Sequence, residues 1–394
     1  MRVLISAGED SGDLYAASLV QALRARHPDA EFFGCAGPRM QEAGVRPIID
    51  MRSIAVVGLV EVVRYIPRIL SQFRRLVRAI PKEHPEIAIL TDAPDFNLRL
   101  ARQLRRRNVP VAYLIAPQAW AWRQGRARGM RRTISRLLCI FPFECEFFET
   151  RGIRTTYIGH PLARIVKPSL TRSEFCAKFG IPLESRVLAV LPGSRHGVVE
   201  RHLPILLEAI RTIRHRHAVT PILALPPGFG ADTASFRERI LSESIQVTEG
   251  FTWDVLAQAE LALTALGTVT VEAALLGVPM VTFYRVNELS WILGRWLVKA
   301  PQFCMANLLA GRRIVPELVQ KEMTSERIAA EAVDLLDDAS KRAAMRDRLA
   351  EVANGLRSDR DPMEIAADWI ERLWLETEKY GKCASNESFA GRRE

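Results

Sequence analysis

The chain alternates short apolar runs with helical segments along most of its length, and this alternation restricts the fold more than any other feature. Arg2–Ala7, Ile87–Leu90 and Val187–Leu191 are examples of the apolar runs. Strands buried on both faces have this composition, and the helices between them supply the crossovers that parallel strands require. The sequence therefore predicts an α/β fold built on parallel sheets that are covered by helices.

The stretch Leu263–Tyr284 contains the pattern of a nucleotide site. A helix is predicted to begin near Gly267 and Thr268 and to end at Gly277, because glycine readily adopts the positive φ of a helix C-terminus. The unpaired N–H groups and partial positive charge of the helix N-terminus can accept a phosphate. Glu272, one turn further along the same face, is suited to ribose hydroxyls. The alternative is a plain βαβ unit with a solvated Glu272.

Length and composition are those of a folded soluble protein that is long enough for two domains. The 394 residues are 48% apolar and 25% charged. We expect no signal peptide, because the apolar start Val3–Ala7 runs into three acids, and no uncharged apolar run reaches the roughly 18 residues of a membrane helix. The six cysteines lack the spacing of a metal site, so we expect reduced thiols in the cytoplasm and no metal.

Positive charge is concentrated in the N-terminal half. Residues 1–165 contain 26 Lys+Arg and 15 Asp+Glu, a net of +11, whereas residues 166–394 contain 29 and 30, a net of −1; together they give the total of +10. Eleven arginines and no acid lie between Asp95 and Glu144. Such a surface suits nucleic acid, anionic lipid or a phosphorylated substrate.

A stripe of apolar residues at helical spacing runs through Val56–Ile80. Pro67 is expected to begin or kink a helix there. The other face is cationic and consists of Arg64, Arg68, Arg74, Arg75, Arg78 and Lys82. One interpretation is an ordinary helix packed on the sheet. The other is a basic amphipathic surface that rests on anionic lipid, where each cation near the headgroups contributes about 1 kcal/mol.

Polar side chains follow a strand of the N-terminal half at its carboxyl end, where ligands bind in open α/β sheets. Asp92 comes directly off the strand Ile87–Leu90 and is therefore the best-placed general base. Asp95 or Asn97 is expected to cap the helix that follows. If Asp92 is not the base, Asp95 is the next candidate.

Three further features of this half bear on function. The loop Gly8–Asp13 follows the first strand; its glycines are expected to permit a sharp turn, and Ser11 or Asp13 to cap the next helix. A later loop, Ala116–Gln124, contains two tryptophans and an arginine, a combination that rarely serves packing alone. A lone His160 is more often a hydrogen-bonded structural residue than a catalyst, and we expect the same here.

A linker is expected at Leu162–Ser173, after which a second α/β half begins. Arg195 lies at a strand end beside a helix start, where it can bind a pyrophosphate. Neither G-x-G-x-x-G nor a Walker sequence is present, which argues against dinucleotide and ATP sites. The polar tail after Lys379 is expected to be disordered.

Nine motifs occur in one order over about 300 residues. They are GEDSGD at 8–13, AGPRM at 36–40, DAPDFN at 92–97, WAWRQ at 120–124, FPFE at 141–144, IGHP at 158–161, LPGSR at 191–195, GTVTVEAALLGVP at 267–279 and NLLAGR at 307–312. Each is weak alone, but the ordered set resembles the lipid-A-disaccharide synthase family of GT-B glycosyltransferases. Asp10 stands where the family pattern has Thr, and Leu266 where it has Ser before the Gly-Thr pair.

The resemblance implies a GT-B fold, in which two Rossmann-like domains face each other across a cleft. Residues 1–165 would form the acceptor and membrane-facing domain, and residues 166–360 the UDP-sugar-binding domain. Residues 361–378 would form a helix that packs back toward the N-terminal domain, before a polar tail at 379–394. In the implied reaction of lipid A biosynthesis, UDP-2,3-diacylglucosamine gives its sugar to 2,3-diacylglucosamine 1-phosphate. The products are a β-1,6 disaccharide and UDP, with inversion at the anomeric carbon.

The resemblance also implies a role for each matching residue. Asp92 would be the catalytic base; Ser194, Arg195, Gly267, Thr268, Glu272 and Asn307 would hold the UDP donor; and Glu9, Ser11, Trp122 and Arg123 are candidates on the acceptor side. The helix dipole and arginine can stabilise the leaving phosphate, so no metal or other cofactor is required. The protein would act in the cytoplasm, peripherally on the inner face of the cytoplasmic membrane, and a homodimer is one oligomeric state open to it.

Two other functions fit part of the pattern. A UDP-sugar 2-epimerase would share the fold and the nucleotide site, but it would have no use for an acyl-chain surface such as Val56–Ile80. A nucleic-acid-binding module would explain the arginines between Asp95 and Glu144. A nucleic-acid-binding function would not explain the motifs DAPDFN and GTVTVE, and the sequence contains no recognised RNA or DNA motif. We therefore expect no nucleic-acid partner.

Overall fold

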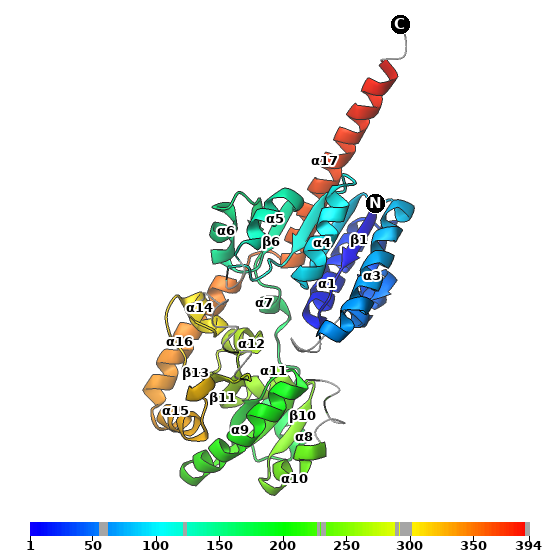
Figure 1. The fold of residues 1–394 in the computed structure, drawn as a ribbon. Helices are drawn as coiled ribbons and strands as arrows, with labels where there is room; N and C mark the ends of the chain where they lie inside the picture. Colours follow the sequence, from blue (N-terminus) through cyan, green and yellow to red (C-terminus); the bar gives the residue numbers. More distant parts are fainter. Residues whose placement is uncertain are drawn as a thin grey trace. The chain divides into compact units, whose positions relative to one another are not determined.

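A computed structural model describes residues 1–54, 62–120, 124–226, 229, 234–287, 291 and 302–390 of the chain (Figure 1). The chain forms two compact units. Unit 1 is Met1–Pro161 with Ser358–Glu394, and unit 2 is Leu162–Arg357. Each unit contains a parallel sheet with interleaved helices, so the predicted α/β fold is confirmed. Among the described helices, none has the length and apolar character needed to cross a membrane.

The sheet of unit 1 has the order β3-β2-β1-β4-β5-β6-β7, and its paired strands are parallel. The strands are β1 (Arg2–Ser6), β2 (Glu31–Ala36), β3 (Arg46–Asp50), β4 (Ile87–Thr91), β5 (Val111–Leu114), β6 (Arg136–Cys139) and β7 (Thr155–Tyr157). Strands β1 and β4 are neighbours, with Ser6 opposite Leu90. The chain order reverses direction between them, so the loops after these strands meet at the point where ligands bind in doubly wound sheets.

The helical elements of unit 1 are α1 (Asp10–Arg26), α2 (Pro38–Glu42), η1 (Met51–Ser53), α3 (Val62–Glu83), α4 (Pro94–Arg105), α5 (Arg126–Thr133), α6 (Pro142–Glu149) and α17 (Pro362–Ala390). The prediction that Ser11 or Asp13 caps α1 is wrong, because both residues lie inside the helix. Asp13 instead accepts hydrogen bonds from the N–H groups of Arg39 and Met40, at 3.0 and 3.1 Å. It thereby satisfies the N-terminus of α2, which follows it by more than 20 residues.

Helix α3 packs on the sheet along its C-terminal half. Leu76 and Ile80 are buried there, and Phe73 lies edge-to-face against Phe96 of α4 with ring centroids 5.4 Å apart. Pro67 does not begin the helix, since the described part already starts at Val62. Residues 56–61 of the predicted apolar stripe lie outside the described residues.

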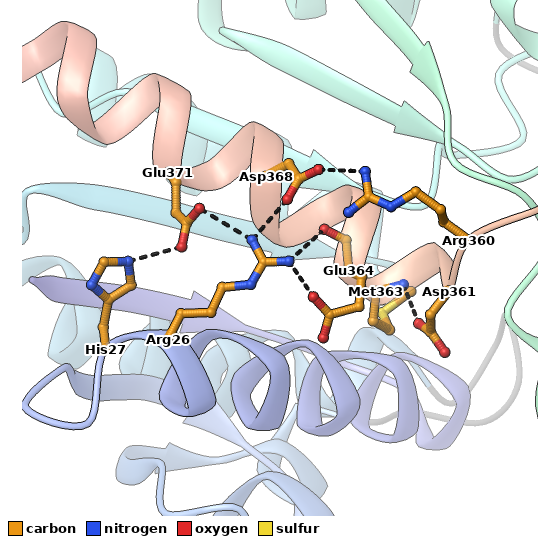
Figure 2. Close-up of polar contacts among 8 residues, drawn as sticks. All are labelled: Arg26, His27, Arg360, Asp361, Met363, Glu364, Asp368 and Glu371. Atoms are coloured by element: carbon orange, nitrogen blue, oxygen red, sulfur yellow. Dashed lines mark hydrogen bonds and ion pairs between the residues drawn. The ribbon is translucent and has the colours of Figure 1, made fainter.

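Helix α17 returns to unit 1 and lies along α1 (Figures 1 and 2). The guanidinium of Arg26 donates to Asp368 at 2.8 Å and to Glu371 at 3.1 Å, and it also pairs with Glu364. His27 Nε2 lies 2.9 Å from the other oxygen of Glu371 (Figure 2). Arg26 is only 25% exposed, so this network is better shielded from water than an ordinary surface ion pair.

The end of α17 differs from the sequence prediction. The helix continues to Ala390, so residues 379–390 are helical and the expectation of a disordered tail after Lys379 is wrong for them. No proline interrupts the i→i−4 hydrogen bonds after Pro362, and one glycine costs a helix only about 1 kcal/mol. Upstream, Arg136 of β6 stacks 3.9 Å above the ring of Trp369, a second anchor between α17 and the sheet.

The sheet of unit 2 has the order β10-β9-β8-β11-β12-β13. Its strands are β8 (Arg186–Leu191), β9 (Val219–Leu225), β10 (Gln246–Glu249), β11 (Ala259–Ala265), β12 (Met280–Tyr284) and β13 (Glu317–Val319). Leu191 of β8 pairs with Thr264 of β11, and Ala265 pairs with Phe283 of β12. The loops that follow β8, β11 and β12 therefore leave the same edge of the sheet side by side.

The helical elements of unit 2 are α7 (Leu162–Ile165), α8 (Arg172–Phe179), α9 (His196–Arg216), α10 (Ala234–Ser242), α11 (Thr252–Ala257), α12 (Val269–Leu275), α14 (Met305–Ala310), η2 (Gln320–Glu322), α15 (Ser325–Asp337) and α16 (Ala339–Leu356). The expected linker Leu162–Ser173 includes α7 and the start of α8. This linker is fixed by the buried Asp254, whose carboxylate accepts hydrogen bonds from the N–H groups of Ser169 and Leu170 at 2.6 and 2.7 Å.

Candidate functional site

Asp92 follows β4 directly, as predicted, and its carboxylate lies over the loop that follows β1. One oxygen accepts the N–H of Gly8 at 2.6 Å, and the other accepts the N–H of Glu9 at 3.0 Å. Glu9 is the residue before α1, so Asp92 accepts an N–H group that the helix start leaves unpaired, and it also accepts the N–H of Gly8 in the preceding loop. The carboxylate is consequently fixed at the edge of the sheet where ligands bind.

The glycines of GEDSGD were predicted to permit a sharp turn, but the structure shows that they instead leave room for neighbouring side chains. Neither Gly8 nor Gly12 has a positive φ. A Cβ atom at Gly12 would lie 1.6 Å from Asp92 Oδ2, and one at Gly8 would lie 2.4 Å from the Cβ of Ala93. The two glycines therefore provide the space that the Asp92 carboxylate and its neighbour occupy, although Asp92 lies 80 or more positions away in the sequence.

The backbone at Asp92 is unusual. Asp92 has φ +47° and Ala93 has φ +34°, two successive non-glycine residues in the left-handed region. Such residues cost of order 1–3 kcal/mol each, and they persist only where neighbouring groups hold them. The main-chain carbonyl of Asp92 accepts the hydroxyl of Tyr113 at 2.6 Å and the side-chain N–H of Asn97 at 3.2 Å.

The predicted helix caps after β4 are wrong. Helix α4 begins at Pro94 with Ala93 as its N-terminal flanking residue, and no side chain caps it. Asn97 is buried inside the helix and bonds main-chain carbonyls, including that of Thr91 at 2.6 Å. Asp95 is exposed and pairs with Arg126 of α5 at 2.6 Å. Asp95 is thus engaged elsewhere, which leaves Asp92 as the carboxylate held at the strand end.

The environment of Asp92 changes its acidity. Burial, together with the negative charges of Glu9 and Asp13, raises the pKa of Asp92 to about 8, although the hydrogen bonds from Gly8 and Glu9 act to lower it. A general base is most effective when its pKa lies near the working pH. The carboxylate is therefore in the range in which it can take and release a proton.

The acceptor-side candidates are only partly described. Glu9 and Ser11 are exposed beside Asp92, at the start of α1. Trp122 and Arg123 lie outside the described residues. The preceding Trp120 is held by Glu144, whose buried carboxylate accepts the indole N–H at 3.1 Å.

Two buried titratable groups lie near this aromatic loop. Burial raises the pKa of Glu144 to about 8, against the N–H donors of Trp120 and the main chain. His160 is also buried, which lowers its pKa to about 3, and its ring lies 5.1 Å from that of Phe141. His160 is consequently a neutral packing residue, in agreement with the structural role expected for it.

In unit 2, the loop after β8 presents Ser194 and Arg195. Both are exposed, and among the described residues no acid pairs with the Arg195 guanidinium. Gly193 has φ +135°, and a Cβ atom there would lie 2.7 Å from Val198 and 3.9 Å from Ala265 at the end of β11. The loop is thus packed against α9 and lies beside the loop that precedes α12.

The second part of this site is the start of α12. Gly267 and Thr268 are exposed and Gly267 has φ +152°; apart from its chain neighbours, no atom of the described residues lies within 4 Å of the place that a Cβ would take at Gly267. Helix α12 ends, as predicted, before Gly277 at φ +67°. Glu272 is half-buried, and one of its oxygens accepts the indole N–H of Trp253 at 2.9 Å. Burial raises the pKa of Glu272, against that hydrogen bond, which lowers it.

The predicted role of Asn307 as a donor contact stays a prediction, and the structure gives this residue a set of hydrogen bonds within its own loop. It is fully buried in α14, and its side chain is saturated by its own loop. Its oxygen accepts the N–H groups of Ile314 and Val315 at 2.7 and 2.9 Å, and its N–H groups donate to Val315 and Glu317 at 3.1 Å. Such a side chain organises the loop after α14 and has little capacity left for a ligand.

Two residues that shape the site, Tyr113 of β5 and His202 of α9, belong to no motif, so the sequence does not identify them. Buried His202 donates from Nδ1 to the carbonyl of Pro192 at 2.7 Å and accepts the N–H of Arg285 on Nε2 at 3.0 Å, an assignment that requires a neutral ring. It ties the loop that carries Arg195 to the end of β12. Burial lowers the pKa of His202, against the main-chain hydrogen bonds, and so favours this neutral form.

A metal site was not expected from the sequence. Within the part of the chain that the structure describes, no group of three or more His, Cys, Asp or Glu side chains is arranged to hold a metal ion. The polar groups gathered at the two strand edges are instead carboxylates, an arginine and main-chain N–H groups, which suit proton transfer and phosphate binding.

Similarity to known proteins identifies the family to which the chain belongs. The model of a family described as lipid-A-disaccharide synthetase matches residues 3–367. A lipid-A-disaccharide synthase from Solibacter usitatus (strain Ellin6076) is 56% identical over 355 residues, which cover 90% of this chain and 93% of that protein. The chain belongs to the lipid-A-disaccharide synthase family. The resemblance inferred from nine ordered motifs is confirmed, and the chain is a glycosyltransferase.

Solved structures show the same fold at low identity. The glycosyltransferase of kitacinnamycin aligns with a TM-score of 0.64 and 18% identity, over 94% of this chain and 98% of that chain. A UDP-GlcNAc 2-epimerase from Neisseria meningitidis aligns with a TM-score of 0.61 and 12% identity, over 95% and 100%. These likenesses establish a GT-B type fold and nothing finer. Family membership, rather than fold, separates this chain from the epimerase alternative.

Two positions depart from the pattern of the lipid-A-disaccharide synthase family. Asp10 is exposed at the first position of α1, where a carboxylate is favoured by the helix dipole. Leu266 precedes Gly267, and its N–H donates to the carbonyl of Phe283 at 3.0 Å. This main-chain bond does not depend on the side chain, so the position of the loop before α12 is retained without the hydroxyl of a serine.

Proposed function

We propose that this member of the lipid-A-disaccharide synthase family transfers 2,3-diacylglucosamine from UDP-2,3-diacylglucosamine to the 6-hydroxyl of 2,3-diacylglucosamine 1-phosphate. The acceptor oxygen forms a bond to the anomeric carbon while the bond from that carbon to the UDP oxygen breaks. The hydroxyl proton goes to a base, and the electron pair of the broken bond goes to UDP. One displacement thus converts the α donor into a β-1,6 product, and no covalent intermediate with the protein is needed.

Asp92 is the proposed base, and its setting is the observation that carries the proposal. Each carboxylate oxygen accepts one main-chain N–H and retains a lone pair for the acceptor hydroxyl. With its pKa raised to about 8 by burial, the group holds a proton more readily than an ordinary aspartate. Exposed Glu9 and Ser11 beside it are proposed to contact the acceptor sugar.

Unit 2 is proposed to bind the donor. Arg195 and the N-terminus of α12 at Gly267 and Thr268 would hold the pyrophosphate, with Ser194 beside them, because a cation and helix N–H groups both stabilise the charge that grows on the leaving UDP. Glu272 would accept ribose hydroxyls on the oxygen that Trp253 leaves free. A UDP-sugar donor is supported by the structural neighbour from Neisseria meningitidis, which was solved with UDP-GlcNAc.

Helix α3 is proposed to attach unit 1 to the inner face of the cytoplasmic membrane. Near its N-terminus, Tyr65 and Ile66 are 45% and 43% exposed. Further along, α3 and β3 line a hollow of about 660 Å³, whose cations are Arg46, Arg74, Arg75, Arg78 and Lys82. Peripheral binding to an anionic membrane needs both an apolar term and a cationic term, and this helix offers both. Both proposed substrates carry acyl chains, so they would be taken from that surface.

The direct test is incubation of the protein with both lipid substrates, followed by mass analysis. We expect equimolar disaccharide 1-phosphate and UDP, with a β-linkage in the product. An epimerase would instead release an isomer of the UDP-sugar without an acceptor. Salt-dependent binding to oligonucleotides with no turnover of the UDP-sugar would favour the nucleic-acid alternative, and either result would contradict the proposal.

A further inference from the structure

Tyr113 is a buried polar residue that the reaction itself does not use. It lies in β5, between Leu90 of β4 and Leu137 of β6, and its side chain is fully buried. Its hydroxyl donates to the main-chain carbonyl of Asp92 at 2.6 Å. A phenol that is buried without a partner would be costly, so this bond is what allows a tyrosine at a position otherwise suited to an apolar residue.

The hydrogen bond from Tyr113 is made to the strained part of the turn at Asp92. Asp92 and Ala93 both have positive φ, a conformation that relaxes unless neighbouring groups hold it. The carbonyl that Tyr113 holds belongs to the peptide between these two residues. Its direction depends on the ψ of Asp92, and the same turn determines where the Asp92 carboxylate points. A group that fixes this carbonyl therefore also fixes the turn that delivers the carboxylate to Gly8 and Glu9.

Asn97 donates a second hydrogen bond to the same carbonyl. Its side-chain N–H donates to Thr91 at 2.6 Å and to Asp92 at 3.2 Å, and its oxygen accepts the hydroxyl of Ser6 at 2.7 Å. Ser6 and Asn97 are fully buried. The Tyr113 bond is the shorter of the two at the Asp92 carbonyl, and it comes from a strand rather than from the helix that the turn begins.

We propose that Tyr113 is a positioning residue for the reaction, which holds the left-handed turn at Asp92 so that the carboxylate meets the acceptor hydroxyl. The proposal rests on the proposed role of Asp92 as base. Removal of the hydroxyl frees the Asp92 carbonyl, and the turn can relax toward ordinary backbone angles. The carboxylate then moves from its place over the β1–α1 loop. Misplacement of a reacting group by about 1 Å can cost on the order of 100-fold in rate.

The test compares Tyr113→Phe with a matched control, Thr133→Val. The first removes only the hydroxyl. The second removes a buried hydroxyl of unit 1 that donates to Gly129 at 2.9 Å and does not touch Asp92. We expect Tyr113→Phe to lower kcat roughly 10- to 100-fold, with nearly unchanged acceptor KM and UDP affinity. The control should keep kcat within about twofold while losing similar thermal stability. Equal, small losses of kcat in the two variants would overturn the proposal.

The same substitution in an Asp92→Asn background separates this proposal from the assignment of the base. If Tyr113 acts through the carboxylate, Tyr113→Phe should change the residual rate of Asp92→Asn by less than about twofold, since interacting residues are not additive. An undiminished loss in that background would overturn the positioning role while leaving Asp92 as base. If Asp92→Asn retained turnover near that of the unsubstituted protein, the base assignment would fail first, and the positioning role with it.

Discussion

Trp253 Nε1 donates a 2.9 Å hydrogen bond to Glu272 Oε2 across the gap between α11 and α12. The bond holds the carboxylate at the start of α12 and leaves the other oxygen for a ligand. Burial raises the pKa of Glu272, so the indole N–H also helps to keep the group ionised. The proposed ribose contact therefore depends on a tryptophan that no motif in the chain identifies.

Glu272→Gln should weaken UDP binding by roughly 1.5–3 kcal/mol, because it removes a charge-assisted hydrogen bond to the ribose. Isothermal titration with UDP measures the loss, and UDP analogues that lack the ribose hydroxyls are the control ligands. These analogues should bind Glu272→Gln and the unsubstituted protein alike. An equal loss for UDP and for the analogues would show that Glu272 supports the fold of the site and does not contact the ribose.

Asp92→Asn should lower turnover by about 10²–10⁴-fold, because the amide retains the size of the side chain but cannot accept a proton. UDP affinity should be nearly unchanged. In the unsubstituted protein the base acts in its ionised form, so kcat/KM should rise with pH through about 8, the raised pKa of Asp92. Asp95→Asn is the matched control. Retention of more than about a tenth of turnover by Asp92→Asn would exclude this residue as the base.

Arg195→Ala should cost more in kcat than in UDP affinity, because negative charge on the leaving phosphate grows in the transition state. Steady-state kinetics and a UDP titration give the two losses. Arg239→Ala is the charge-matched control, since Arg239 is exposed near the end of α10, on the side where β10 begins rather than at the proposed ligand edge. Equal losses in rate and in affinity would mean that Arg195 merely anchors the donor.

Reversal of Arg68, Arg74, Arg75 and Arg78 to Glu should reduce sedimentation with anionic vesicles and leave UDP affinity intact. Each reversal changes the charge by −2, so four take the net charge from +10 to +2. High salt should also release part of the protein, because exposed charges are screened beyond about 8 Å at physiological ionic strength. Reversal of Arg105, Arg106, Arg107 and Arg132 changes net charge equally and is the control. Unchanged sedimentation of the α3 variant would assign that helix to packing alone.

His160 should make the protein acid-sensitive. Its pKa is lowered by burial from 6.5 to about 3 in the folded protein, so between these values only the unfolded chain binds a proton at this residue. Stability should therefore fall as the pH falls from 6.5 toward 3, by up to about 1.4 kcal/mol per pH unit from this group. His160→Phe should flatten the slope of unfolding free energy against pH in urea titrations. Exposed His215→Gln should leave the slope as it is, and an unaltered slope in His160→Phe would contradict the buried, neutral state.

Local sequence patterns predict the alternation of strands and helices, the start of α12 near Gly267 and its end before Gly277. These features depend on local rules: the composition of buried strands, the unpaired N–H groups at a helix start, and the positive φ that glycine adopts. Asp92 as the residue that leaves β4 also follows from the sequence, because it comes directly after an apolar run. The ordered motifs were enough to indicate the family, since their order along the chain is itself a sequence property.

The contacts that hold these residues in place come from parts of the chain that are distant in sequence. Asp92 receives its N–H donors from a loop 84 and 83 positions away and its carbonyl partner from Tyr113, 21 positions away, because β1, β4 and β5 are adjacent in the sheet. Gly12 is required because a side chain there would overlap the Asp92 carboxylate, and not because of a turn. Asn307 uses its side-chain hydrogen bonds within its own loop. Both residues belong to motifs, yet the motifs do not reveal these contacts. Strand order and register create these contacts, and no pattern within a short stretch of chain encodes which strands become neighbours.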